Sequence, residues 1–145
     1  MKSKNIIESE EGIRKIVEAI TTVAVVGMKD ESQEDTAAYQ IPRMLIEHGL
    51  KVIPVNPKIE TSLGLKAYPS LAAYGKAVDL VDVFRAPPAV GPLAEEVLAL
   101  PVSNRPKVFW MQSGIRHEEA AIKLADAGIR VVMDACLGVY VSRYR

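Results

Sequence analysis

The chain has 145 residues, of which 49% are hydrophobic and 25% are charged, a composition typical of one folded globular domain rather than of a disordered or fibrous protein. Eighteen Lys and Arg balance eighteen Asp and Glu without a basic run, so the charge pattern of a general nucleic-acid-binding protein is missing. One cysteine, Cys136, and two histidines exclude an internal disulfide framework and argue against a metal site, and no apolar stretch reaches the roughly 20 residues of a membrane span.

Apolar residues occur along the chain both at helical spacing and in short continuous runs, and the two patterns alternate. The elements that they predict, in chain order, are a helix at residues 9–20 capped by Ser9, a strand at 23–27, a helix from about 38 to a stop at Gly49, a strand at 51–55, a loop at 56–69, a short helix at 70–74, a strand at 78–84, a helix at 88–99, a strand at 108–111, a helix at 117–127, a strand at 129–133 and a short tail at 135–145. The second helix begins late in this prediction so that Pro42 falls in its first turn. Pro54 should place its missing N–H at the end of its strand or on an irregular edge.

Strands that alternate with helices through right-handed crossovers predict an α/β fold. We expect one domain over residues 1–145, Rossmann-like and doubly wound, with a parallel sheet of about five strands and helices on both faces. The simplest strand order is 3-2-1-4-5, and exposed edge strands would make a homodimer plausible.

Ligands of such sheets bind at the carboxyl ends of the strands, near the point where the strand order reverses. Small, polar and proline-rich residues follow the predicted strands at 27–32, 56–58, 84–87, 112–114 and 134–136. Gly27 lacks the second and third glycines of the dinucleotide fingerprint, and it serves equally well as a residue that merely ends a strand. The carboxylates of Asp30 and Glu31, beside Lys29, would repel a phosphate unless they point away from it.

The end of the second strand is more specific, because NAD-binding Rossmann domains place an Asp or Glu there for the ribose hydroxyls. This chain has Asn56, Pro57 and Lys58 instead. A lysine favours a ribose that carries a phosphate, which puts NADP and coenzyme A (CoA) ahead of NAD. A surface lysine without a binding role is the alternative.

Five blocks of the sequence carry a resemblance to a known family. They are residues 25–27, 52–57, 82–85, 110–112 with Gly114, and 131–134 with Cys136. Taken in this order over residues 20–137, they resemble the small stand-alone CoA-binding domain proteins of bacteria and archaea. Those proteins are similar in turn to the amino-terminal CoA-binding domain of the succinyl-CoA synthetase alpha subunit. The resemblance implies a Rossmann-like domain that holds CoA across the strand ends.

Residue by residue, the resemblance implies Gly27 and Met28 under the diphosphate, Asn56, Pro57 and Lys58 by the adenosine and its 3′-phosphate, Phe84, Arg85, Ala86 and Pro87 along the flank of the ligand, and Gln112 and Gly114 on the far side. The chain departs from the pattern at two places. Lys29, Asp30 and Glu31 stand where such relatives often have Ser, Thr and basic residues, and Ala135 replaces an arginine that often precedes the late cysteine.

No catalytic residue is predicted, because the ligase domain and phosphorylated histidine of the synthetases are absent from these residues. His117 is interpreted as a solvent-facing helix residue and Cys136 as a small buried hydrophobe, while three carboxylates (Asp79, Asp82 and Asp134) do not form a pair in the sequence. We therefore expect a cytoplasmic, non-enzymatic protein that binds CoA or an acyl-CoA and contacts neither nucleic acid nor membrane. The alternatives are a minimal NADP-dependent oxidoreductase and an interaction protein that has lost ligand binding.

Overall fold

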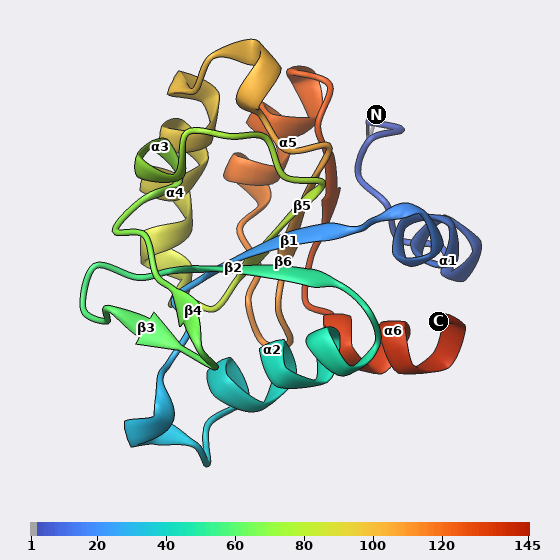
Figure 1. The fold of residues 1–145 in the computed structure, drawn as a ribbon. Helices are drawn as coiled ribbons and strands as arrows, with labels where there is room; N and C mark the ends of the chain where they lie inside the picture. Colours follow the sequence, from blue (N-terminus) through green and yellow to red (C-terminus); the bar gives the residue numbers. More distant parts are fainter. Residues whose placement is uncertain (1–2) are drawn as a thin grey trace.

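Five parallel strands form the centre of the computed structural model, which describes residues 3–145 (Figure 1). The strands are β1 (Thr22–Val26), β2 (Lys51–Val55), β5 (Leu80–Val83), β6 (Val108–Met111) and β7 (Arg130–Val132). Nearly all their residues are buried, as expected of parallel strands that helices cover on both faces. The predicted α/β fold with a five-stranded parallel sheet is confirmed.

The order of the strands is β2-β1-β5-β6-β7, so the predicted order 3-2-1-4-5 is wrong. After β2 the chain forms a small antiparallel hairpin from β3 (Thr61–Ser62) and β4 (Leu65–Lys66), then the short helix α3 (Leu71–Tyr74), in the region predicted as a loop and a helix. It then returns to the opposite side of β1 and pairs there as β5. The order therefore reverses between β1 and β5, and this is the topological switch point of the sheet.

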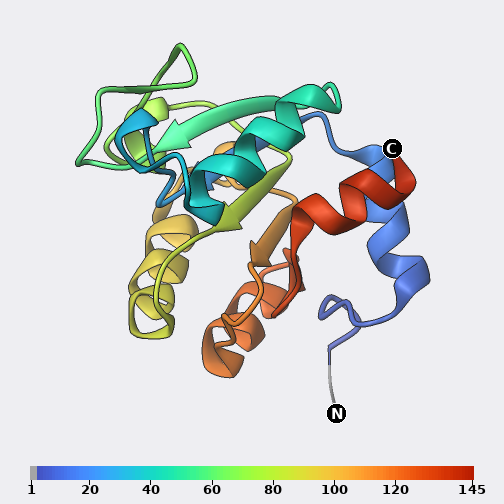
Figure 2. The ribbon, with the colours of Figure 1, turned by 90° about the horizontal axis from the view of Figure 1, so that it is seen from below.

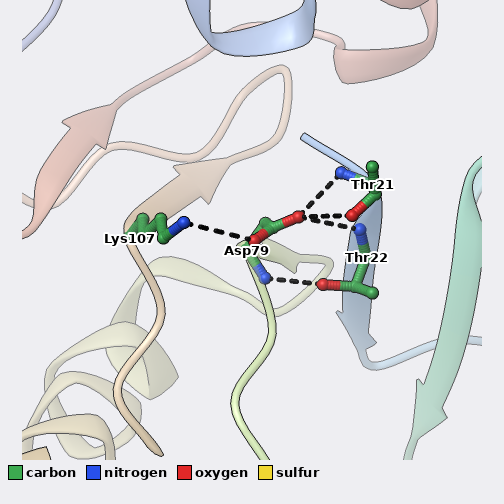
Figure 3. Close-up of polar contacts among 4 residues, drawn as sticks. All are labelled: Thr21, Thr22, Asp79 and Lys107. Carbon is green, nitrogen blue, oxygen red and sulfur yellow. Dashed lines mark hydrogen bonds and ion pairs between the residues drawn. The ribbon is translucent and has the colours of Figure 1, made fainter. Parts of the chain in front are cut away.

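A carboxylate at the amino end of β5 explains this placement (Figure 3). Asp79 Oδ2 accepts hydrogen bonds from the N–H and hydroxyl of Thr21, at 2.7 and 2.9 Å, and from the N–H of Thr22, at 3.1 Å. The Thr22 hydroxyl in turn accepts from Asp79 N–H at 2.8 Å, and Lys107 Nζ lies 3.8 Å from Asp79 Oδ1. These contacts hold the start of β5 beside the start of β1, and a pattern based on hydrophobic periodicity does not contain them.

Helices cover both faces of the sheet (Figure 2). One face carries α1 (Glu10–Ala19), α2 (Ala37–Glu47) and α6 (Leu137–Tyr144), and the other carries α3, α4 (Pro87–Ala99) and α5 (Glu118–Asp126). Short 3₁₀ turns lie at Glu31–Gln33 and Val102–Asn104. No helix among residues 3–145 has the length and apolar character of a membrane span.

Helix α6 stands where the sequence predicts a short tail. Leu137 and Val141, one helical turn apart, are fully buried against the sheet. Gly138 lets α2 approach closely, since a Cβ there would lie 3.0 Å from Ile41 Cδ1 and 3.1 Å from Met44 Sδ. Tertiary packing stabilises this helix despite its glycine and β-branched residues, which have low helix propensity.

Both edges of the sheet are covered by short segments, which removes the edge-strand argument for a homodimer. At β7, Ile7 N–H donates to Val131 O and Val131 N–H donates to Asn5 O, both at 2.8 Å. At β2, Tyr68 N–H donates to Pro54 O at 3.0 Å. Because the N and C=O of one strand residue point to the same side, the missing N–H of Pro54 faces this irregular outer edge, as predicted.

Candidate ligand-binding site at the switch point

An open cleft of about 340 Å³ lies at the carboxyl ends of β1, β2 and β5, where the strand order reverses. Its lining residues are Gly27, Lys29, Asn56, Pro57, Lys58, Phe84 and Arg85. All of these except Lys29 are among the site residues predicted from the sequence. The cleft thus brings together three loops that are separated by almost sixty residues of chain.

Gly27 is required by the backbone at this point. Its φ is +89°, and a Cβ would overlap the carbonyl oxygen of Phe84. The three strand ends are linked there by Gly27 N–H donating to Val55 O and by Phe84 N–H donating to Val26 O, both at 2.9 Å. The need for close packing therefore explains the glycine, and it also leaves the floor of the cleft without a side chain.

The loop after β1 is held by contacts from three other segments. Asn56 Nδ2 donates to Met28 O at 2.9 Å, and Ser62 Oγ donates to Lys29 O at 2.7 Å. Lys29 N–H donates to Ala38 O at 3.1 Å. The side chain of Asn56 is buried, and its Oδ1 also accepts from the N–H of Lys58 at 2.9 Å. Asn56 therefore connects and positions two of the loops that line the cleft.

The contact to Ala38 corrects the prediction for Pro42. Helix α2 begins at Ala37, so Pro42 is its sixth residue and lies in the helix interior rather than in the first turn. A proline there cannot donate to the carbonyl four residues earlier, which belongs to Ala38. Lys29 N–H supplies the missing hydrogen bond, so the proline makes a helix carbonyl available to hold the loop.

Three cations, Lys29, Lys58 and Arg85, lie around the cleft, and no carboxylate of residues 3–145 forms an ion pair with any of them. Other arginines of the chain do have such partners, as in the pairs of Arg116 with Glu118 and of Arg143 with Glu10. Unpaired positive charges that converge on a concave surface favour an anionic ligand. Lys29 was not predicted as a site residue, because the neighbouring carboxylates of Asp30 and Glu31 were expected to repel a phosphate.

The acidic residues of the same loop point away from the cleft. Asp30 Oδ1 accepts hydrogen bonds from the hydroxyl and the N–H of Ser32, which hold the pKa of Asp30 below its ordinary value. Glu31 Oε2 accepts from Leu63 N–H at 2.8 Å and from Tyr39 O–H at 3.2 Å. Neither carboxylate lines the cleft, although the charge of Lys29 also contributes to the lowered pKa of Asp30.

The remaining predicted site residues lie outside the cleft lining: Met28, Ala86, Pro87, Gln112 and Gly114. The Met28 side chain is fully buried in the core. Ala86 and Pro87 form the start of α4. The buried side chain of Gln112 accepts from Leu137 N–H at 3.0 Å and so caps α6, while Gly114 N–H donates to Asp134 Oδ1 at 2.7 Å.

The residues considered for catalysis are dispersed. Asp79 precedes β5, Asp82 lies within it and Asp134 follows β7, so they form no carboxylate pair. His117 caps α5 by accepting from Ala120 N–H at 3.0 Å, and the partly exposed Cys136 precedes α6. Among residues 3–145, His, Cys, Asp and Glu form no group of three that could hold a metal ion.

A family model described as "CoA binding domain" matches residues 21–142, which is most of the chain and includes every loop of the cleft. The chain belongs to the CoA binding domain family. The resemblance stated from the five sequence blocks is thereby confirmed.

Similar proteins span the same length. The chain is 36% identical over 131 residues to the uncharacterized protein YneT of Bacillus subtilis (strain 168), covering 90% of this chain and 93% of that protein. A solved Thermus thermophilus structure, cell-free ID.343, is 38% identical with a TM-score of 0.85 and covers 95% of this chain and 100% of its own. A hypothetical protein from Pyrococcus horikoshii OT3 is 30% identical with a TM-score of 0.83, covering 99% and 96%. This member of the CoA binding domain family therefore shares its fold with chains of nearly the same length.

Proposed function

We propose that the protein binds CoA or an acyl-CoA in the cleft at the carboxyl ends of β1, β2 and β5, without catalysing a reaction. The observation that carries this proposal is the set of three unpaired cations, Lys29, Lys58 and Arg85, around the open floor at Gly27. CoA carries negative charge at two separate places, a diphosphate and a 3′-phosphate, so cations spread over three loops match its charge distribution.

The loop after β1 suits the diphosphate. The N–H of Gly27 donates to Val55 O and that of Lys29 donates to Ala38 O, so the backbone of this loop is fixed at both positions. Lys29 and Arg85 flank this loop from β1 and β5. Because the loop is fixed by Asn56 and Ser62, we expect little ordering cost when a ligand binds.

Lys58 is the residue that we assign to the 3′-phosphate. It follows β2, its side chain is exposed at the cleft, and its backbone is held by Asn56 Oδ1. A lysine at this place would also suit the 2′-phosphate of NADP, so NADP is the alternative ligand for this residue. The dispersal of Asp79, Asp82 and Asp134 supports binding without catalysis.

Isothermal titration calorimetry with CoA, dephospho-CoA and NADPH tests the proposal. Lys58→Ala should weaken CoA binding by about 1–3 kcal/mol, the range for hydrogen bonds to charged groups, and leave dephospho-CoA nearly unchanged. Lys66→Ala is the matched control, since Lys66 is an exposed lysine of β4 outside the cleft. This variant should bind CoA as tightly as the parent protein.

Three results would contradict parts of this proposal. An equal loss for CoA and dephospho-CoA would remove the assignment of Lys58, while binding of NADPH without CoA would favour the oxidoreductase. If neither ligand binds or raises the melting temperature, the protein is not a CoA carrier, because a ligand of the native state must stabilise it by about 2.7 kcal/mol at a hundredfold excess over Kd.

A further inference from the structure

A second cavity, of about 220 Å³, opens at the same carboxyl edge of the sheet, at the end of β7. Its walls come from the segment that covers the edge of β7, from the residues that follow β7, and from α1 and α6. The partly buried apolar side chains of Ile7, Met133 and Tyr140 line the cavity, together with the charged residues Glu8, Arg116 and Asp134. No residue of the cleft described above takes part in this lining, so the two hollows are separate.

The strand order places the two hollows in line. The cleft ends at Phe84, after β5, and the second cavity begins at Met133, after β7, with only β6 between them. Two strand spacings correspond to about 10 Å. A pantetheine arm can span this distance, and the other direction is occupied, because Asn56 N–H and Tyr68 O are joined at 2.9 Å beyond the outer edge of β2.

Two residues that follow β6, Gln112 and Gly114, lie between the two hollows in the strand order. Gln112, at the end of β6, turns its side chain inward to cap α6. Gly114 is exposed, and a Cβ built there would meet nothing within 4 Å. Its N–H donates to Asp134, which is held with a left-handed φ of +55° at the wall of the second cavity.

We infer that this second cavity receives the acyl group of an acyl-CoA and that it selects a short, uncharged acyl chain. The inference rests on the proposed function. The exposed parts of the Ile7, Met133 and Tyr140 side chains offer apolar surface to methylene groups. Arg116 is the one cation of the lining, and its guanidinium already pairs with Glu118 at 2.8 Å, while Glu8 and Asp134 add two carboxylates to the same lining. A terminal carboxylate on the acyl chain therefore meets no free positive charge.

Calorimetric titration with CoA, acetyl-CoA, butyryl-CoA and succinyl-CoA tests this inference. Burial of one methylene changes affinity by about fourfold, so butyryl-CoA, with two more methylenes, should bind roughly fifteenfold more tightly than acetyl-CoA, and succinyl-CoA should gain nothing over CoA. Ile7→Trp places a large ring at the cavity and should abolish the gain of butyryl-CoA without altering the affinity for CoA itself. Met133→Trp fills the same cavity from another lining residue, and it provides the test if Ile7→Trp fails to fold.

Ile122→Trp, on the exposed surface of α5, is the control for a new tryptophan and should keep the preference for butyryl-CoA. Equal affinity for CoA and all acyl-CoAs would overturn the acyl pocket and leave the proposed CoA binding intact. Tightest binding of succinyl-CoA would overturn the selection of uncharged chains. Absence of binding by CoA itself would overturn the proposed function and the acyl pocket with it.

Discussion

Asp82 is a carboxyl group enclosed within the sheet. It lies in β5 between Val25 of β1 and Trp110 of β6, its exposed fraction is 0%, and neither of its oxygens has a hydrogen-bond partner in residues 3–145. Burial raises its pKa well above the ordinary value. The native protein therefore keeps the Asp82 proton over a pH range in which the unfolded chain has released it.

This difference predicts how stability changes with pH. Because the native pKa is raised, the contribution of Asp82 is fully present below the unfolded pKa and is lost as pH rises toward the native pKa. The loss is about 1.4 kcal/mol for each pH unit in that interval. Asp82→Asn cannot ionise, so its free energy of unfolding should lack this pH-dependent loss.

Urea unfolding at a series of pH values measures this effect, and the buried Trp110, the one tryptophan of the chain, provides the fluorescence signal. The free energy of unfolding of the parent protein should fall relative to that of Asp82→Asn as pH rises. Parallel curves for the two proteins would refute the reasoning, since they would mean that Asp82 ionises equally in both states. Asp79→Asn is a control of opposite sign.

Further predictions concern the contacts of Asp79 with Thr21 and Thr22, the cleft, and the packing of α2 against α6. Burial raises the pKa of Asp79, but hydrogen bonds from Thr21 and Thr22 outweigh it and the pKa is lowered, so its stabilisation is present at neutral pH and lost as pH falls through the native value. Asp79→Asn should therefore lower the free energy of unfolding by about 2–3 kcal/mol at pH 7. If the parent protein and the variant lose stability equally as pH falls, the predicted direction of the pH dependence is wrong. Gly27→Ala should destabilise by about 2–3 kcal/mol, and an unaffected melting temperature would disprove the close approach of β1 and β5. Ser62→Ala should cost about 1 kcal/mol and weaken CoA several-fold by calorimetry, whereas an unaltered Kd would show that the loop does not need this support. Gly138→Val should cost about 1–3 kcal/mol by separating α2 from α6, and a neutral result would argue against their tight packing.

The sequence predicted the repeating units of the fold better than their arrangement. Buried strands have a strong local pattern, and β6 was predicted with its observed bounds. The strand order depends on contacts such as Asp79 with Thr21, which join residues 58 positions apart and leave no periodic signal. Helix α6 was missed for a related reason, because its stability comes from packing against α2 rather than from its own residues.

The candidate site was predicted in part for the same physical reasons. Residues that directly follow strands, such as Lys58 and Arg85, reach the cleft because parallel strands end at one edge of the sheet. Gln112 also follows a strand, but its side chain turns inward to α6, a direction that sequence position does not determine. Lys29 was undervalued because the hydrogen bonds that turn Asp30 and Glu31 away become visible only in three dimensions.

The hydrogen bonds of Asp79 with Thr21 and Thr22 and the cleft at Gly27 lie at opposite ends of β1 and β5, which are neighbours in the sheet. With strands of about five residues, roughly 15 Å separates the contacts that fix the sheet from those proposed to meet a ligand. Such a division makes the scaffold evolvable, since residues 29, 58 and 85 can be randomised together without touching the interactions that set the strand order. A library at these three positions should therefore retain the fold while it searches for new phosphorylated ligands.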